Sequence, residues 1–226
     1  MHGWAGSTPA GRMGLSIAIA TGLYGISFGA LSVAAGLGFW QTMALSALMF
    51  TGGSQFAYIG VVAGGGGGVS ALAAASLLGL RNAVYGMQVN RMLGPRGWVR
   101  LLAAHVTIDE STATAAAQTS VDEQRRGFWA AGLGVFAFWN LFTAVGALLG
   151  DVVGDPRRWG LDGAAVAAFA GLLWPRLRGR EPAAVAVVCG LATALALPWL
   201  PPGIPILVAA AVAAGWALWP RRGGAA

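Results

Sequence analysis

Long apolar runs separated by short polar or glycine-rich connections leave this chain few possible folds. The runs lie at about 15–35, 40–62, 69–90, 99–119, 128–150, 162–175, 183–200 and 204–219. An α-helix needs about 20 apolar residues to cross the hydrocarbon core of a bilayer. Because backbone polar groups in lipid must be paired within the protein, such runs predict membrane-spanning helices.

The composition excludes the alternative classes. Of the 226 residues, 57% are hydrophobic and 10% are charged, whereas soluble domains carry roughly 25% charged residues. So few polar residues cannot cover a soluble core, and disordered chains are poor in apolar residues. We therefore predict an all-α polytopic membrane protein with about seven to eight hydrophobic helices. The predicted parts are a tail at 1–12, a single transmembrane domain at 13–219 and a tail at 220–226.

The arginines are distributed as topology signals rather than as a patch for nucleic acid. Ten lie in short tracts beside the apolar runs: Arg91, Arg96, Arg100, Arg125, Arg126, Arg176, Arg178, Arg180, Arg221 and Arg222. Cytoplasmic connections are enriched in such residues. All ten can lie inside, with a cytoplasmic C-terminus, only if the polar run 99–119 does not cross completely. We therefore expect at least one broken or re-entrant segment. The side of the N-terminus stays open, because it depends on whether 40–62 crosses or folds back.

Arg81 is the strongest single signal for function. It lies near the middle of the run 69–90, where an arginine costs about 2.5–3.5 kcal/mol on insertion scales. It should therefore face the protein interior and have a partner. It can hold a substrate carboxylate through its guanidinium fork, or it can form a structural or gating ion pair with Asp109 or Glu110. Asn82 and Tyr85 are further polar candidates for the same substrate site.

Three titratable residues in the run 99–119 are candidates for proton coupling. His105 is four residues before Asp109, so the two can share a helix face, and Glu110 follows directly. A carboxylate–histidine pair inside a membrane can relay protons. The alternative is that this run lies at the membrane interface and its acids are solvated.

The tract Thr51-Gly52-Gly53-Ser54-Gln55-Phe56 interrupts an otherwise apolar run. Adjacent glycines weaken a helix by about 1 kcal/mol each, and broken helices often line the substrate site of a transporter. Gly52, Gly53, Ser54 and Gln55 are therefore candidate substrate-binding residues. Close packing of small residues is the alternative, and it is favoured for Gly25 and Gly29. Trp139 lies mid-run, where its indole N–H needs a partner.

No cofactor, metal or enzyme chemistry is expected. The two histidines and the scattered acids form no ligand cluster, and Cys189 stands alone. Neither His-Glu-x-x-His nor an ATP-binding motif is present in the sequence. Energy for transport would therefore come from an ion gradient or from the substrate gradient.

The order of several motifs resembles the AzlC family, the large subunit of branched-chain amino acid exporters. The motifs are Phe28-Gly29, Trp40-Gln41, Gly52-Gly53-Ser54-Gln55-Phe56, Leu80-Arg81-Asn82-Ala83-Val84-Tyr85-Gly86, Asp109-Glu110-Ser111 and Gly160-Leu161-Asp162. The resemblance covers roughly residues 13–180. The family's Asn-Leu-Arg-His pattern reads Gly79-Leu80-Arg81-Asn82 here.

The resemblance implies a permease of the bacterial plasma membrane that works with a small, hydrophobic AzlD-type subunit. It implies export of valine, leucine, isoleucine and also methionine, and the residues named above add proton coupling as an expectation. Two other readings stay open: a passive channel or a permease for another small apolar solute, and a structural subunit whose Arg81 pairs with a partner helix.

Overall fold

The computed structural model describes residues 8–153, 158, 160, 163, 166, 167, 170 and 173–219, and these contain helices but no strand. The helices are α1 (Pro9–Leu23), α2 (Gly25–Ala34), α3 (Phe39–Leu48), α4 (Gly53–Ala63), α5 (Gly68–Leu93), α6 (Trp98–His105), α7 (Asp109–Ala116), α8 (Val121–Val153), the 3-10 turn η3 (Trp174–Leu177), α10 (Arg180–Ala196) and α11 (Ile204–Leu218). The predicted all-α class is confirmed.

The predicted number of seven to eight spanning helices is not confirmed. In the described part of the chain, Pro9–Ala34 and Val121–Gly150 are long and apolar enough to cross a membrane. The first comprises α1 and α2, which continue past a single turn at Tyr24. The predicted run 162–175 lies largely outside the described residues, as do Leu161-Asp162 and the tail 220–226. Helix α1 begins at Pro9, within the stretch assigned to the N-terminal tail.

The run 40–62 folds back on itself as a hairpin of two half-helices, α3 and α4. The turn between them contains Gly52, whose φ of +53° lies in the left-handed region that favours glycine. Across the hairpin, Gln55 Nε2 donates to the carbonyl oxygens of Leu45 at 3.0 Å and Ser46 at 3.3 Å. The bond to Ser46 satisfies a carbonyl that the end of α3 leaves unpaired. The Leu45 carbonyl also accepts from the backbone N–H of Met49 at 3.0 Å.

The run 99–119 forms a second hairpin, from α6 and α7, with its turn at residues 106–108. The Ser111 hydroxyl closes this turn, because it donates to the carbonyl of Val106 at 2.8 Å and accepts from the N–H of Ile108 at 3.0 Å. The start of α8 returns to the end of α5, where Arg125 Nη2 donates to the carbonyl of Leu93 at 3.4 Å. The run therefore does not cross the protein, as its arginine-rich flanks required.

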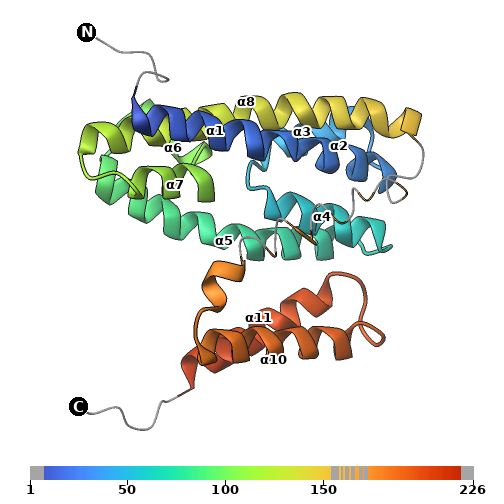
Figure 1. The fold of residues 1–226 in the computed structure, drawn as a ribbon. Helices are drawn as coiled ribbons and strands as arrows, with labels where there is room; N and C mark the ends of the chain where they lie inside the picture. Colours follow the sequence, from blue (N-terminus) through green and yellow to red (C-terminus); the bar gives the residue numbers. More distant parts are fainter. Residues whose placement is uncertain are drawn as a thin grey trace, which may run out of the picture.

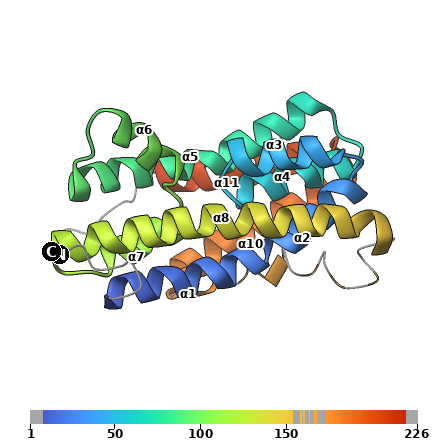
Figure 2. The ribbon, with the colours of Figure 1, turned by 90° about the horizontal axis from the view of Figure 1, so that it is seen from above.

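The two hairpins enter from opposite ends of the molecule. The long helices α1–α2, α5 and α8 run side by side, with α3 and α4 over one half of their length and α6 and α7 over the other (Figures 1 and 2). The tips of the hairpins, at residues 49–52 and 106–108, meet near the middle. This arrangement of half-helices is what positions the candidate site.

Glycines bring α1 and α2 against the backbone of α8. A Cβ added at Gly25 would lie 2.8 Å from the carbonyl oxygen of Trp139, and one added at Gly29 would lie 2.6 Å from the nitrogen of Ala147. On the α8 side, a Cβ at Gly146 would overlap the carbonyl oxygen of Ile26. Gly25 and Gly29 therefore serve close helix packing, as their spacing indicated.

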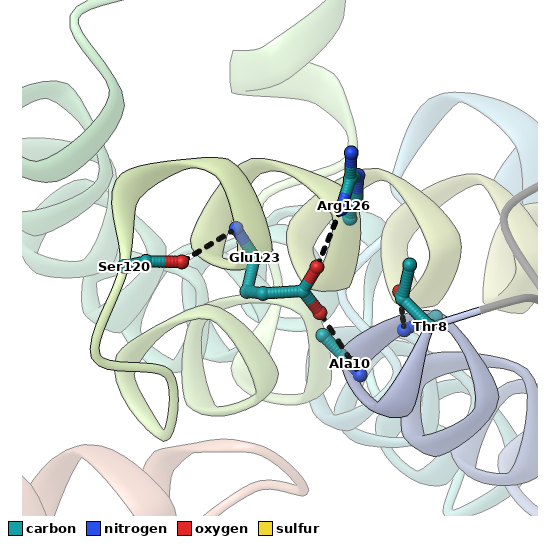
Figure 3. A network of polar contacts seen from close by, with 6 residues as sticks. Thr8, Ala10, Ser120, Glu123 and Arg126 are labelled. Atoms are coloured by element: carbon teal, nitrogen blue, oxygen red, sulfur yellow. Dashed lines mark hydrogen bonds and ion pairs between the residues drawn. The ribbon is translucent and has the colours of Figure 1, made fainter. Parts of the chain in front are cut away.

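The starts of α1 and α8 are joined at one end of the molecule. Glu123 accepts a hydrogen bond from the backbone N–H of Ala10 at 3.3 Å and pairs with Arg126 at 2.6 Å, and Ser120 caps its backbone N–H at 3.3 Å (Figure 3). Thr8 caps α1 beside them.

Arginines gather at this same end. They belong to the start of α1, the end of α5, its connection to α6, α6 itself and the start of α8, elements that Figure 1 shows at this end: Arg12, Arg91, Arg96, Arg100, Arg125 and Arg126. At the opposite end the connections 35–38 and 64–67 carry no charge, and the last turn of α8 contains Asp151. Helices α10 and α11 form an antiparallel pair (Figure 1). Their connection lies against this opposite end, where Pro202 is next to Gly64. Arg178 and Arg180 thus lie toward the arginine-rich end.

Candidate functional site

A cavity of about 360 Å³ lies where the two hairpin tips and the α1–α2 turn meet. Its wall is mainly apolar. The lining residues are Ala20, Thr21, Tyr24, Phe50, Thr51, Gly52, Gly53, Phe56, Arg81, Ile108, Asp109, Glu110, Val135 and Trp139. Discontinuous helices whose breaks surround one cavity are a common way to build a transporter binding site.

Arg81 connects the two hairpin tips through the cavity wall. Its Nη1 lies 3.1 Å from Asp109 Oδ2 at the start of α7, and its Nη2 donates to the carbonyl oxygen of Thr51 at 3.0 Å. The guanidinium therefore has one partner on each hairpin. This is the ion pair with Asp109 that the sequence allowed. The side chains remain 30% and 15% exposed, which leaves them within reach of a ligand in the cavity.

The two acids of the cavity occupy the first turn of α7. Carboxylates are favoured there, because the unpaired N–H groups of a helix start carry partial positive charge. Asp109 pairs with Arg81, whereas the Glu110 carboxylate interacts with the Thr21 side chain of α1 and with nearby Arg81. With both acids ionised, this wall would carry one more negative than positive charge.

The structure brings only part of the predicted substrate site to the cavity. Gly52, Gly53 and Arg81 line it, but Ser54, Gln55, Asn82 and Tyr85 are not among its lining residues. Gln55 is fully buried and holds the α3–α4 hairpin. Asn82 Nδ2 donates to the carbonyl of Thr107 at 3.2 Å and so holds the tip of the other hairpin.

His105 does not share a helix face with Asp109, so this expectation is wrong. The helix ends at His105, and the turn at residues 106–108 places Asp109 on a different helix. The imidazole packs between Phe50, at 6.1 Å between ring centroids, and Phe136, at 5.4 Å. His105 thus lies next to a lining residue, outside the cavity itself.

Most of the residues that line the cavity were not predicted from the sequence. Thr21 and Tyr24 lie in a run that gave no sign of a turn, and Phe50, Ile108 and Val135 resemble any other apolar residue. Trp139 did carry a signal, since it lies mid-run with a polar atom. It is 2% exposed and lines the cavity.

Broken helices that surround a cavity with charged residues are typical of membrane transport proteins when the chain is apolar and all-helical. The model of the family described as AzlC protein matches residues 16–153. That stretch is more than half of the chain and contains every lining residue of the cavity, and the chain belongs to the AzlC family. No curated protein and no solved structure matches it.

Proposed function

We propose that the protein is a permease that exports valine, leucine, isoleucine and also methionine across the bacterial plasma membrane. The cavity between the hairpin tips carries this proposal, because one wall is charged and the rest is largely apolar. Arg81, Asp109 and Glu110 form the charged wall. A zwitterion with an aliphatic side chain matches both kinds of wall, and family membership supports the same class of cargo.

The charged groups of the cavity bind opposite ends of the substrate. Asp109 and Glu110 attract the ammonium group, whereas Arg81 offers donors to the carboxylate. A carboxylate that competes with Asp109 and with the Thr51 carbonyl would loosen the link between the hairpins. Substrate binding and hairpin movement would then be coupled through Arg81, which is what alternating access requires.

Orientation follows from the arginine-rich end. Positive residues mark cytoplasmic connections, so the starts of α1 and α8, together with Arg178 and Arg180, lie inside the cell. Both ends of the described chain would then face the cytoplasm. The α6–α7 hairpin enters from inside and the α3–α4 hairpin from outside.

Proton coupling is assigned to Glu110. His105, which packs against Phe50 outside the cavity and on its cytoplasmic side, is a further candidate. The Glu110 carboxylate has no salt bridge among the described residues. Proton uptake there would release a bound ammonium group. A small AzlD-type subunit completes the transporter, as in the family that this chain belongs to.

Efflux tests this function directly. Cells without their own exporters are loaded with labelled leucine, valine, isoleucine or methionine, and they express this chain with and without the small subunit. We expect saturable efflux that needs both chains and slows when a protonophore collapses the proton gradient. A Glu110→Gln variant should lose this dependence and fall at least about tenfold in rate, which corresponds to about 1.4 kcal/mol.

The matched control is Glu181→Gln, an exposed glutamate at the start of α10 and away from the cavity. It should behave as the wild type. No efflux of any of the four amino acids, with both chains present in the membrane, would contradict the proposed cargo. Non-saturable efflux unaffected by the protonophore would favour a passive channel instead.

A further inference from the structure

Trp139 is a buried side chain with a polar atom, and it has no role in the function proposed above. It lies near the middle of α8, is 2% exposed and lines the cavity, and its indole Nε1 has no hydrogen-bond partner among the described residues. The ring is fixed by aromatic neighbours. It stacks on Phe28 at 5.9 Å between centroids and meets Tyr24 edge-on at 5.7 Å and Phe56 at 6.3 Å.

The unpaired indole is one of several unsatisfied groups around the same cavity. The Tyr24 hydroxyl, the Thr51 hydroxyl and Arg81 Nε also lack partners within the part of the chain that the structure describes, and all three residues are part of its lining. Buried polar groups in proteins are normally paired, and no lipid can supply the missing bond. Four of the ten buried side-chain atoms without a partner in the described part of the chain belong to residues that line this one cavity, which indicates that a ligand completes these four.

The chemistry of these atoms selects the part of the ligand that they meet. An indole N–H and a guanidinium N–H can only donate, so the ligand must present acceptors. An ammonium group cannot satisfy them, but a carboxylate can. The same region contains the start of α4, which no side chain caps and which favours negative charge.

We infer that Trp139 is a substrate-contacting residue whose indole N–H, together with the Tyr24 hydroxyl, donates to the carboxylate of the exported amino acid. This inference rests on the proposed function and deepens it. It places the carboxylate toward α8 and the α1–α2 turn, beside Arg81, and it leaves Asp109 and Glu110 for the ammonium group. Trp139 then helps to distinguish amino acids from simple amines.

A pair of ligands that differ only in the carboxylate tests this assignment. Binding of leucine and of 3-methylbutylamine, which is leucine without its carboxylate, is measured on the purified full-length protein with its small subunit. Trp139→Phe keeps an aromatic ring and removes the N–H. We expect about tenfold weaker leucine binding, or about 1.4 kcal/mol, and unchanged amine binding. Tyr24→Phe should show the same selective loss and serves if Trp139→Phe does not fold.

Trp129→Phe is the matched control, since Trp129 lies on the same helix but does not line this cavity. It should bind both ligands normally. Unchanged leucine binding by Trp139→Phe, or an equal loss for both ligands, would overturn the inference while leaving the proposed function standing. Wild-type protein that binds no leucine would contradict the proposed function itself, and the inference with it.

Discussion

Replacement of Arg81 by alanine is expected to lower leucine efflux by at least about 100-fold, or about 2.7 kcal/mol. The guanidinium holds both hairpin tips, through Asp109 at 3.1 Å and the Thr51 carbonyl at 3.0 Å. Its removal leaves Asp109 without its cation in an apolar setting and removes the donors for the substrate carboxylate. Initial efflux rates, normalised to the amount of protein in the membrane, measure the effect.

Two further variants separate a transport role of Arg81 from a purely structural one. Arg81→Lys keeps the charge but loses the planar fork, and we expect normal membrane levels with about tenfold slower efflux. The double variant Arg81→Ala/Asp109→Asn contains no uncompensated charge at this position. Its amount in the membrane should therefore equal that of the wild type, while its efflux should stay low. Recovery of efflux in that double variant would show that Arg81 acts only as a structural partner.

Replacement of Gly29 by valine should prevent stable folding. A Cβ at Gly29 would lie 2.6 Å from the nitrogen of Ala147, well inside van der Waals contact, and the neighbouring atoms are backbone rather than flexible side chain. The α2–α8 contact would have to open, and overpacking of this kind costs typically 1–3 kcal/mol or more. We expect membrane levels of the variant to fall at least about tenfold, as measured by quantitative immunoblotting and by thermal unfolding in detergent.

Gly190→Val is the control for this packing prediction. Gly190 is also a helical glycine, in α10, but none of the described residues has an atom within 4 Å of an added Cβ. The variant should accumulate as the wild type does. Normal levels of Gly29→Val would mean that α2 does not pack on α8 as closely as described.

The sequence predicted the fold class, and the arginine distribution predicted that 99–119 does not cross. Both follow from strong physical constraints, namely the cost of polar groups in lipid and the bias of arginine toward the cytoplasm. The sequence also indicated that Arg81 can pair with Asp109 or Glu110, because an arginine in the middle of a membrane needs a counter-charge. These residues now form the charged wall of one cavity.

The remaining site residues could not be assigned from the sequence because hairpin turns free backbone carbonyls. Gln55 donates to the freed carbonyl of Ser46 and Asn82 donates to that of Thr107. An amide that closes a turn looks the same in sequence as an amide that binds substrate. His105 was misplaced for a related reason, since helical spacing to Asp109 holds only if the helix is continuous. Tertiary contacts decide both cases.

Leucine is proposed to bind in the cavity between the hairpin tips, and protection of an introduced cysteine in that cavity is the sharpest test of this proposal. Thr51→Cys is introduced into a Cys189→Ala background, with Val69→Cys as the control, because Val69 is 85% exposed near the start of α5. The purified protein, with its small subunit in lipid nanodiscs, is treated with N-ethylmaleimide with and without saturating leucine. Leucine should slow the modification of Thr51→Cys at least about tenfold and leave the modification of Val69→Cys unchanged. Equal rates for Thr51→Cys with and without bound leucine would contradict this proposal.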